Sequence, residues 1–235
     1  MTELTIEIGK KIRNFRRMRK LTLAELAQMV CKSQSTISKY EKGEIAVDIE
    51  TLYEIAAALQ IHVEQLLFHR ETESEMLPTG NCPAFFHGRS QFYGYLFDGR
   101  SNRLIRCVFD VLSQTEQRSS RVAMYMNFKS FEAYQDCENT YWGRMEHYDA
   151  LTNLILTNQD TPMERASLQI LASYLDSDSK WGLFNGFSSR PMMPIATKML
   201  LCKERQKEDE QLLQKLKISK EDIRLLKLYN MLSIT

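Results

Sequence analysis

The chain has 235 residues, of which 43% are hydrophobic and 26% are charged. This ordinary globular composition leaves room for two modest domains, and it excludes a wholly disordered or collagen-like chain. The formal net charge is only +1, so any affinity for nucleic acid must come from locally concentrated charge.

The first twenty residues carry such a concentration, with seven lysines and arginines against two glutamates. Ile6, Ile8, Ile12 and Phe15 lie among them at spacings that partly fit one face of a helix over about residues 3–19. A basic amphipathic helix alone is as often a solvated face as a binding surface, so its meaning depends on the residues that follow.

Two short helices are predicted next. Thr22 and Glu25 form a capping box, in which each side chain bonds a free backbone N–H at the start of a helix. Ser33 is a second N-cap, before a helix over residues 34–42, and Gly43 suits the position after its end. Two such helices, joined by a few residues, make a helix-turn-helix.

The prediction for residues 1–70 is completed by a fourth helix capped by Asp48 and a short fifth helix at 63–68. In a helix-turn-helix, the start of the second helix reaches base edges in the major groove of DNA. The Gln and Lys side chains there can pair with adenine and guanine, while Ser and Thr are adaptable.

These residues resemble the XRE/Cro-type family of phage and bacterial repressors over about residues 6–68. The resemblance is carried by an ordered set: Ile12-Arg13, Arg16, Leu21-Thr22, Glu25-Leu26-Ala27, Ser33, Ile37-Ser38, Tyr40-Glu41, Gly43, Leu52, Ile55-Ala56 and Leu59. It implies a five-helix, lambda-repressor-like DNA-binding domain. Leu23 departs from the family pattern, which usually has a polar residue there to hold a phosphate.

The resemblance also implies roles by position. Base contacts are expected from Gln34, Ser35 and Lys39, with Thr36 beside them. Phosphate contacts are expected from Ser33, Arg16 and Lys42, and Arg13 either contacts a phosphate or pairs internally with Glu41. Glu41 itself is expected to be an internal charge partner, because phosphates repel a carboxylate.

Residues 71–90 are polar, acidic and turn-rich, and they predict a linker. Cys82 and His87 could begin a metal site, but no second pair with ligand spacing follows, so we expect a packed anchor and no metal. The five cysteines form no C-x-x-C pair, and no leader pattern is seen, which predicts reduced thiols in a cytosolic protein. The apolar runs are too short to span a membrane.

Residues 91–202 change in character and predict strands. The candidates are 91–97, 104–112, 122–128, 141–148, 151–156, 168–175, 181–187 and 193–201. Seven or eight short strands predict an antiparallel barrel or sandwich. A helix near Met163–Leu171 stays open, and the prolines of residues 187–194 predict a bend or strand break.

A ligand cavity is a second expectation for this part, because antiparallel barrels commonly enclose one at a mouth. The candidate lining residues combine aromatic bodies with polar tips: Tyr141, Trp142, Arg144, His147, Trp181, Asn185 and Arg190. The alternative is that the aromatic residues fill the core while the arginines stay solvated. No known catalytic or cofactor-binding motif appears, so we expect neither an enzyme nor a cofactor.

A helical hairpin is predicted for residues 203–235, with one helix over 203–217 and another capped by Ser219. It could pack on its own domain or on a second subunit. The whole chain is therefore interpreted as a cytosolic, homodimeric regulator that represses transcription at a palindromic double-stranded DNA operator, with a sensing or dimerisation domain that a small-molecule effector controls. The rivals are an antitoxin-like module whose β domain binds a protein, and an enzyme localised by its helical domain.

Overall fold

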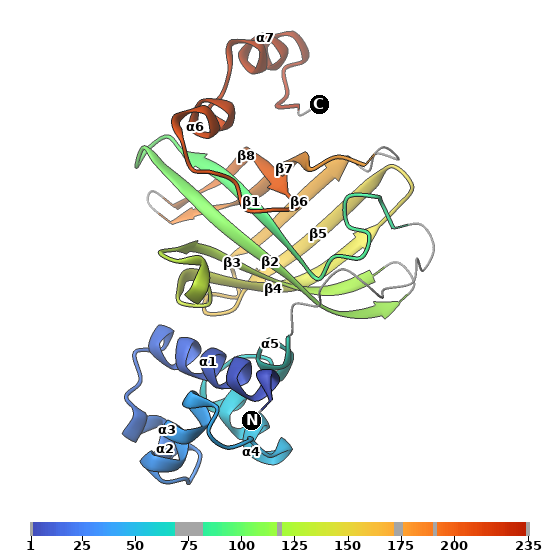
Figure 1. The fold of residues 1–235 in the computed structure, drawn as a ribbon. Helices are drawn as coiled ribbons and strands as arrows, with labels where there is room; N and C mark the ends of the chain where they lie inside the picture. Colours follow the sequence, from blue (N-terminus) through green and yellow to red (C-terminus); the bar gives the residue numbers. More distant parts are fainter. Residues whose placement is uncertain (1, 69–81, 117–118, 172–175, 190–191, 234–235) are drawn as a thin grey trace. The chain divides into compact units, whose positions relative to one another are not determined.

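The computed structural model describes residues 2–68, 82–116, 119–171, 176–189 and 192–233 (Figure 1). The chain divides into two compact units. One consists of residues 1–70 and 128–138, and the other of residues 71–127 and 139–235. Each unit has buried hydrophobic residues of its own.

The described residues of the N-terminal part contain five helices, as predicted. They are α1 (Glu3–Met18), α2 (Leu23–Met29), α3 (Gln34–Lys42), α4 (Ile49–Ala58) and α5 (Val63–Leu67). Their core consists of fully buried apolar residues: Ile12, Phe15, Leu26, Ile37, Ile55, Leu59 and Leu66. Helices α1 and α3 cross so closely that a Cβ at Gly9 would overlap the carbonyl oxygen of Tyr40. This crossing holds the basic first helix against the third.

A closed antiparallel barrel of eight strands follows in the described residues (Figure 1). The strands are β1 (Gln91–Asp98), β2 (Arg103–Glu116), β3 (Ser119–Phe128), β4 (Cys137–His147), β5 (Leu151–Asn158), β6 (Arg165–Leu171), β7 (Ser179–Ser189) and β8 (Met192–Cys202). A short 3-10 helix, Phe131–Ala133, lies between β3 and β4. Pairing of Tyr93 with Cys202 and of Tyr95 with Leu200 closes the barrel between β1 and β8.

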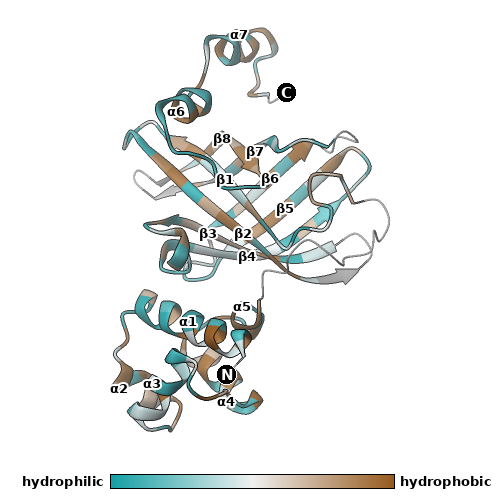
Figure 2. Cartoon of the chain, viewed as in Figure 1, coloured by the Kyte–Doolittle hydropathy of each residue, from teal (hydrophilic) through white to brown (hydrophobic). Residues whose placement is uncertain are grey.

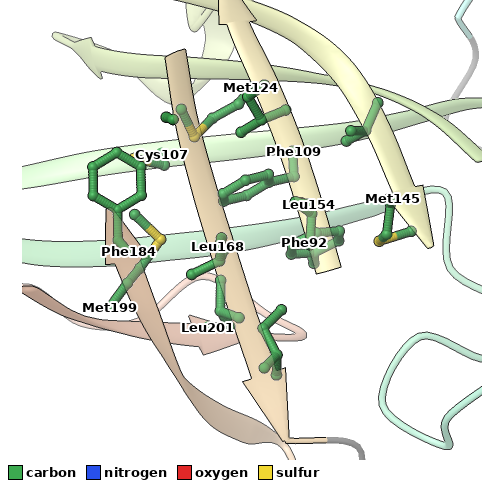
Figure 3. Packing of buried hydrophobic residues seen from close by; sticks show 14 of the residues in the cluster. Phe92, Cys107, Phe109, Met124, Met145, Leu154, Leu168, Phe184, Met199 and Leu201 are labelled. Atoms are coloured by element: carbon green, nitrogen blue, oxygen red, sulfur yellow. The ribbon is translucent and has the colours of Figure 1, made fainter. Parts of the chain in front are cut away.

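Buried and more exposed side chains alternate along strands of the barrel, whose residues are coloured by hydropathy in Figure 2. In β5, for example, Thr152, Leu154 and Leu156 are buried, whereas Ile155 between them is exposed. Ten labelled core residues from different strands point toward one another in Figure 3: Phe92, Cys107, Phe109, Met124, Met145, Leu154, Leu168, Phe184, Met199 and Leu201.

Two details of the barrel differ from what the sequence suggests. The helix left open near Met163–Leu171 is a strand, β6, because Ala166, Leu168 and Ile170 alternate toward the core. In the segment 187–194, where a bend or break was expected, Pro194 instead lies within β8 and pairs with Phe187, while Arg190 and Pro191 lie outside the described residues. Among the described residues, β8 pairs with β1 only at Leu200–Cys202, so Pro194 lies where β8 has a neighbour on the β7 side alone and the missing N–H of proline is tolerated.

The C-terminal part contains two helices, α6 (Glu210–Leu216) and α7 (Lys220–Tyr229). The predicted first helix over 203–217 is wrong in its first half. Residues 203–209 are not helical, because Asp209 caps α6 and Gln206 donates its backbone N–H to the Tyr95 hydroxyl. In the described parts of the chain, no helix has the length and apolar character needed to cross a bilayer.

Candidate nucleic-acid interface

Helices α2 and α3 form the predicted helix pair, and local hydrogen bonds determine where each begins. The Thr22 N–H donates to Glu25 Oε2 at 2.7 Å, and the Glu25 N–H donates to Thr22 Oγ1 at 3.2 Å. The bonds that the Thr22 N–H and hydroxyl donate to the Glu25 carboxylate hold the pKa of Glu25 below its usual value. Four residues after the end of α2 at Met29, Ser33 Oγ accepts the N–H of Thr36 at 3.0 Å and starts α3. The capping box and the second cap are therefore both confirmed.

The solvent face of α3 carries the residues predicted to contact bases. Gln34, Ser35 and Lys39 are exposed, and Thr36 is half-buried. Ile37 points into the core on the other side of the helix. A helical turn separates Ser35 from Lys39, so both present hydrogen-bonding groups along one stripe, as a helix in the major groove requires.

The start of α3 also suits a phosphate. Its first backbone N–H groups and the helix dipole favour an anion there. The Ser33 hydroxyl lies 2.8 Å from the Ser35 hydroxyl and 2.7 Å from that of Thr36, so three hydroxyl groups gather at this end. Each can reorient its hydrogen toward an anionic oxygen.

Arg16 has an internal role that its assignment as a phosphate contact did not include. Its Nε and Nη2 donate to the two carboxylate oxygens of Glu41 at 2.5 and 2.9 Å, and its Nη1 donates to the Leu21 carbonyl at 2.7 Å. The side chains of Arg16 and Glu41 are only 11% and 6% exposed. The hydrogen bond to Glu41 raises the pKa of Arg16.

Glu41 is thus an internal charge partner, as expected, but its partner is Arg16 and not Arg13. Arg16 is the partner because its side chain is half-buried within the helical domain, whereas Arg13 is exposed on α1. A phosphate contact by Arg13 stays a prediction. A phosphate contact by Arg16 would have to use the N–H groups that take no part in these three bonds.

Two further lysines near α3 are exposed to solvent. Lys42, a predicted phosphate contact, is 63% exposed and lies 3.6 Å from Glu44. Lys32, which precedes the Ser33 cap, is exposed as well, and sequence reasoning missed it. Its charge adds to the hydrogen bonds from Thr51 that lower the pKa of Asp48. The sequence did contain a signal for Lys32, because it is a cation directly before the N-cap of the second helix of the pair.

The candidate ligand residues of the barrel do not share one face. Tyr141 and His147 are buried at odd positions of β4, whose odd positions face the interior with Met145. Trp142 and Arg144 occupy the even positions and face outward.

On β7, the core residue Phe184 has the opposite parity from Trp181 and Asn185, so these two lie on the outer face. Lys198 and Lys215 stand over the ring of Trp181 at 5.1 and 5.9 Å. Arg190 lies outside the described residues. A ligand role for these residues stays a prediction, but the barrel does not bring them together around one cavity.

Metal ligands do not gather in the described ranges, where no group of three or more His, Cys, Asp or Glu side chains could hold an ion. Cys82 packs against the barrel core, and burial raises the pKa of its thiol to about 11.

Comparison with known proteins identifies the helical part. Residues 12–66 match the model of the helix-turn-helix family HTH_3. The chain is 31% identical to the clp gene regulator ClgR from C. glutamicum, over 28% of this chain and 87% of that one, with a TM-score of 0.28. The family assignment therefore has both a family model and a relative behind it.

Two longer matches extend over most of the chain. An HTH_3 family transcriptional regulator from Vibrio cholerae is 16% identical, over 86% of this chain and 98% of that one, with a TM-score of 0.27. Hydroxypropylphosphonic acid epoxidase from S. wedmorenis is 11% identical, over 86% and 93%, with a TM-score of 0.26. No match was found among curated proteins.

Proposed function

The chain belongs to the helix-turn-helix family through residues 12–66, and from this premise we propose that it is a sequence-specific DNA-binding transcriptional regulator that acts as a repressor. The observation that carries the proposal is the solvent face of α3, where Gln34, Ser35 and Lys39 are exposed beside the Ser33 cap. These groups suit base edges and phosphates, and the buried Arg16–Glu41 pair holds the helix that presents them.

The proposal has further parts. The regulator works in the cytoplasm as a homodimer and reads a palindromic operator, because helix-turn-helix proteins usually read two half-sites related by a twofold axis. Its barrel senses a small-molecule effector or holds the dimer together. An effector regulates the protein only if it binds one arrangement of the two DNA-binding domains more tightly than the other. Equal affinity for both arrangements would shift no equilibrium.

The proposal includes no catalytic activity. The support is that the sequence contains none of the known catalytic or cofactor-binding motifs.

Selection of bound fragments from genomic DNA, with purified full-length protein at physiological salt, tests the proposed function. We expect one palindromic site with half-sites about one helical turn apart, next to genes that the protein controls. Binding that is sensitive to salt but blind to sequence would contradict a sequence-specific regulator.

Substitutions in α3 then test the assignment of residues. Gln34→Ala and Lys39→Ala should each relax the base preference at one position by about 1–3 kcal/mol, because each removes a base-edge contact. Lys42→Ala is the matched control, since it should weaken all sequences alike and lower the salt slope by about one. Unchanged selectivity in the first two variants would refute the base contacts.

A further inference from the structure

The segment that leads into the barrel inserts two aromatic rings into its core. Phe85 and Phe86 are buried together with the residues that line the barrel interior, although they belong to no strand. The ring of Phe86 meets that of Phe92 edge-on at 5.3 Å, and Phe92 stacks on Phe109 of β2 at 4.6 Å. The two rings therefore continue the aromatic core of the barrel.

Buried side chains and local turns hold the part before Gly88, whereas the part after it is anchored, because the Ser90 carbonyl accepts the Val111 N–H of β2 and Arg89 pairs with Glu204. The Phe86 N–H donates to the Pro83 carbonyl and the Arg89 N–H to the Phe86 carbonyl, both within the segment. Gly88 follows with a φ of +67°, and a Cβ placed on it would meet nothing within 4 Å. A left-handed glycine in open space between the rings and β1 is a suitable hinge.

The hydrophobic cluster that contains the two rings includes adaptable side chains. Met124, Met145 and Met199 line the interior (Figure 3), and methionine adapts its shape to different neighbours. One polar pair lies beside the Phe86 ring. His147, whose ring is 5.1 Å away, bonds the buried Thr152 hydroxyl through Nδ1 at 3.0 Å. Burial lowers the pKa of His147 to about 4, so the imidazole is neutral at physiological pH.

We propose that Phe85 and Phe86 are an exchangeable plug, and that the site they occupy binds an uncharged ligand with an aromatic ring and one hydrogen-bonding group. The ring replaces Phe86 on the face of Phe92, and the polar group bonds His147. Residues 82–87 swing out about Gly88 when the ligand enters, while Ser90 stays bonded to Val111 of β2. This inference deepens the sensing role in the proposed function and rests on it for its effect on DNA binding, because the plug is the covalent connection between the helical domain and β1.

If the plug blocks the site, removing it should raise the affinity for the ligand. The reason is that a protein binds with a lower apparent affinity when its open, binding-competent state is rarely populated. The probe is N-phenyl-1-naphthylamine, an uncharged diarylamine whose fluorescence rises in apolar surroundings. We expect the full-length Phe86→Ala variant to bind it at least about tenfold more tightly than the unaltered protein. Phe187→Ala is the control, because Phe187 is an exposed phenylalanine of β7, and it should leave the affinity unchanged.

A second variant keeps the test independent of the core. Gly88→Ala strains the plugged conformation without a clash, and it should raise the affinity about fivefold. If circular dichroism shows that Phe86→Ala does not fold, Gly88→Ala decides. Equal or weaker binding by every folded variant, or a rise as large in Phe187→Ala, would overturn the plug.

The DNA affinity of the same proteins without probe separates the two hypotheses. If the unaltered protein shows no sequence-specific DNA binding, the hypothesis of a regulator is refuted, and the result with the probe still stands. Equal probe affinities with intact DNA binding would refute the plug alone.

Discussion

At the scale of single residues, one ion pair connects helices that are distant in sequence. Arg16 of α1 bonds both carboxylate oxygens of Glu41 in α3 and the Leu21 carbonyl before α2. The pair joins all three helices of the candidate interface. Because both side chains are nearly buried, removing one partner leaves the other charge without compensation.

We therefore expect Arg16→Ala to lower the free energy of unfolding of the helical domain by about 3 kcal/mol. Arg13→Ala, an exposed arginine on the same helix, should change it by less than about 0.5 kcal/mol. Urea unfolding followed by far-ultraviolet circular dichroism measures both. A stable Arg16→Ala protein with a reduced salt slope for DNA would instead assign Arg16 to a phosphate.

His147 gives the barrel a dependence on pH. Its pKa is about 4 in the folded barrel because burial disfavours the charged form, whereas an unfolded chain has the ordinary value of 6.5. The unfolded state thus binds the proton more tightly. The resulting stability is complete above pH 6.5 and is lost as the pH falls toward 4, by about 3 kcal/mol.

Urea unfolding of the unaltered protein and of His147→Gln across this range checks the prediction. The carboxylates titrate in both proteins, so the difference between the two isolates the histidine. Parallel curves from pH 6.5 to 4 would show that His147 does not titrate with a lowered pKa.

At the scale of elements, α6 packs on the outside of the barrel, beside Trp181 of β7. Leu212 and Leu216 of α6 are buried, and Lys215 reaches the ring of Trp181 on β7. The segment before α6 is bound as well, since Arg106 of β2 pairs with Glu208 at 2.6 Å. Because α6 is too short to be stable alone, these contacts hold it.

Leu216→Ala should therefore lower the stability of the barrel by about 3 kcal/mol through lost packing. The matched control is Leu228→Ala on α7, whose side chain is 62% exposed, and it should cost less than about 0.5 kcal/mol. The emission of Trp181 and Trp142 during urea unfolding reports both. Equal stability of the two variants would mean that α6 adds nothing to the barrel.

At the scale of the whole molecule, the proposed dimer makes a geometric prediction about DNA. Two recognition helices related by a twofold axis read half-sites about 34–36 Å apart, on the same side of the duplex. Inserting five base pairs between the selected half-sites turns one of them to the opposite side, and the affinity should fall to that of a single half-site. Gel-shift titration measures this, with two altered half-sites as the control. An unchanged affinity would show that one head binds alone.

Much of the helical domain could be predicted because its signals are local. The Thr22–Glu25 box and the Ser33 cap act within a single turn of helix, so a few neighbouring residues determine where α2 and α3 begin. Gly43, with a φ of +68°, ends α3 for an equally local reason. The exposed side chains of α3 follow from these boundaries and from the 3.6-residue period.

The partner of Glu41, the face of each barrel residue and the closure of the sheet were decided only by the tertiary structure. Arg13 and Arg16 are alike in sequence, and only the crossing of α1 over α3 selects Arg16. Tyr141 points inward and Trp142 outward because of strand register, which a shift of one residue would reverse. The choice of a barrel over a sandwich depends on β8 meeting β1, strands about a hundred residues apart. By itself, the sequence determined the bonds made within one turn or one strand, whereas contacts between distant segments depend on how all the elements pack together.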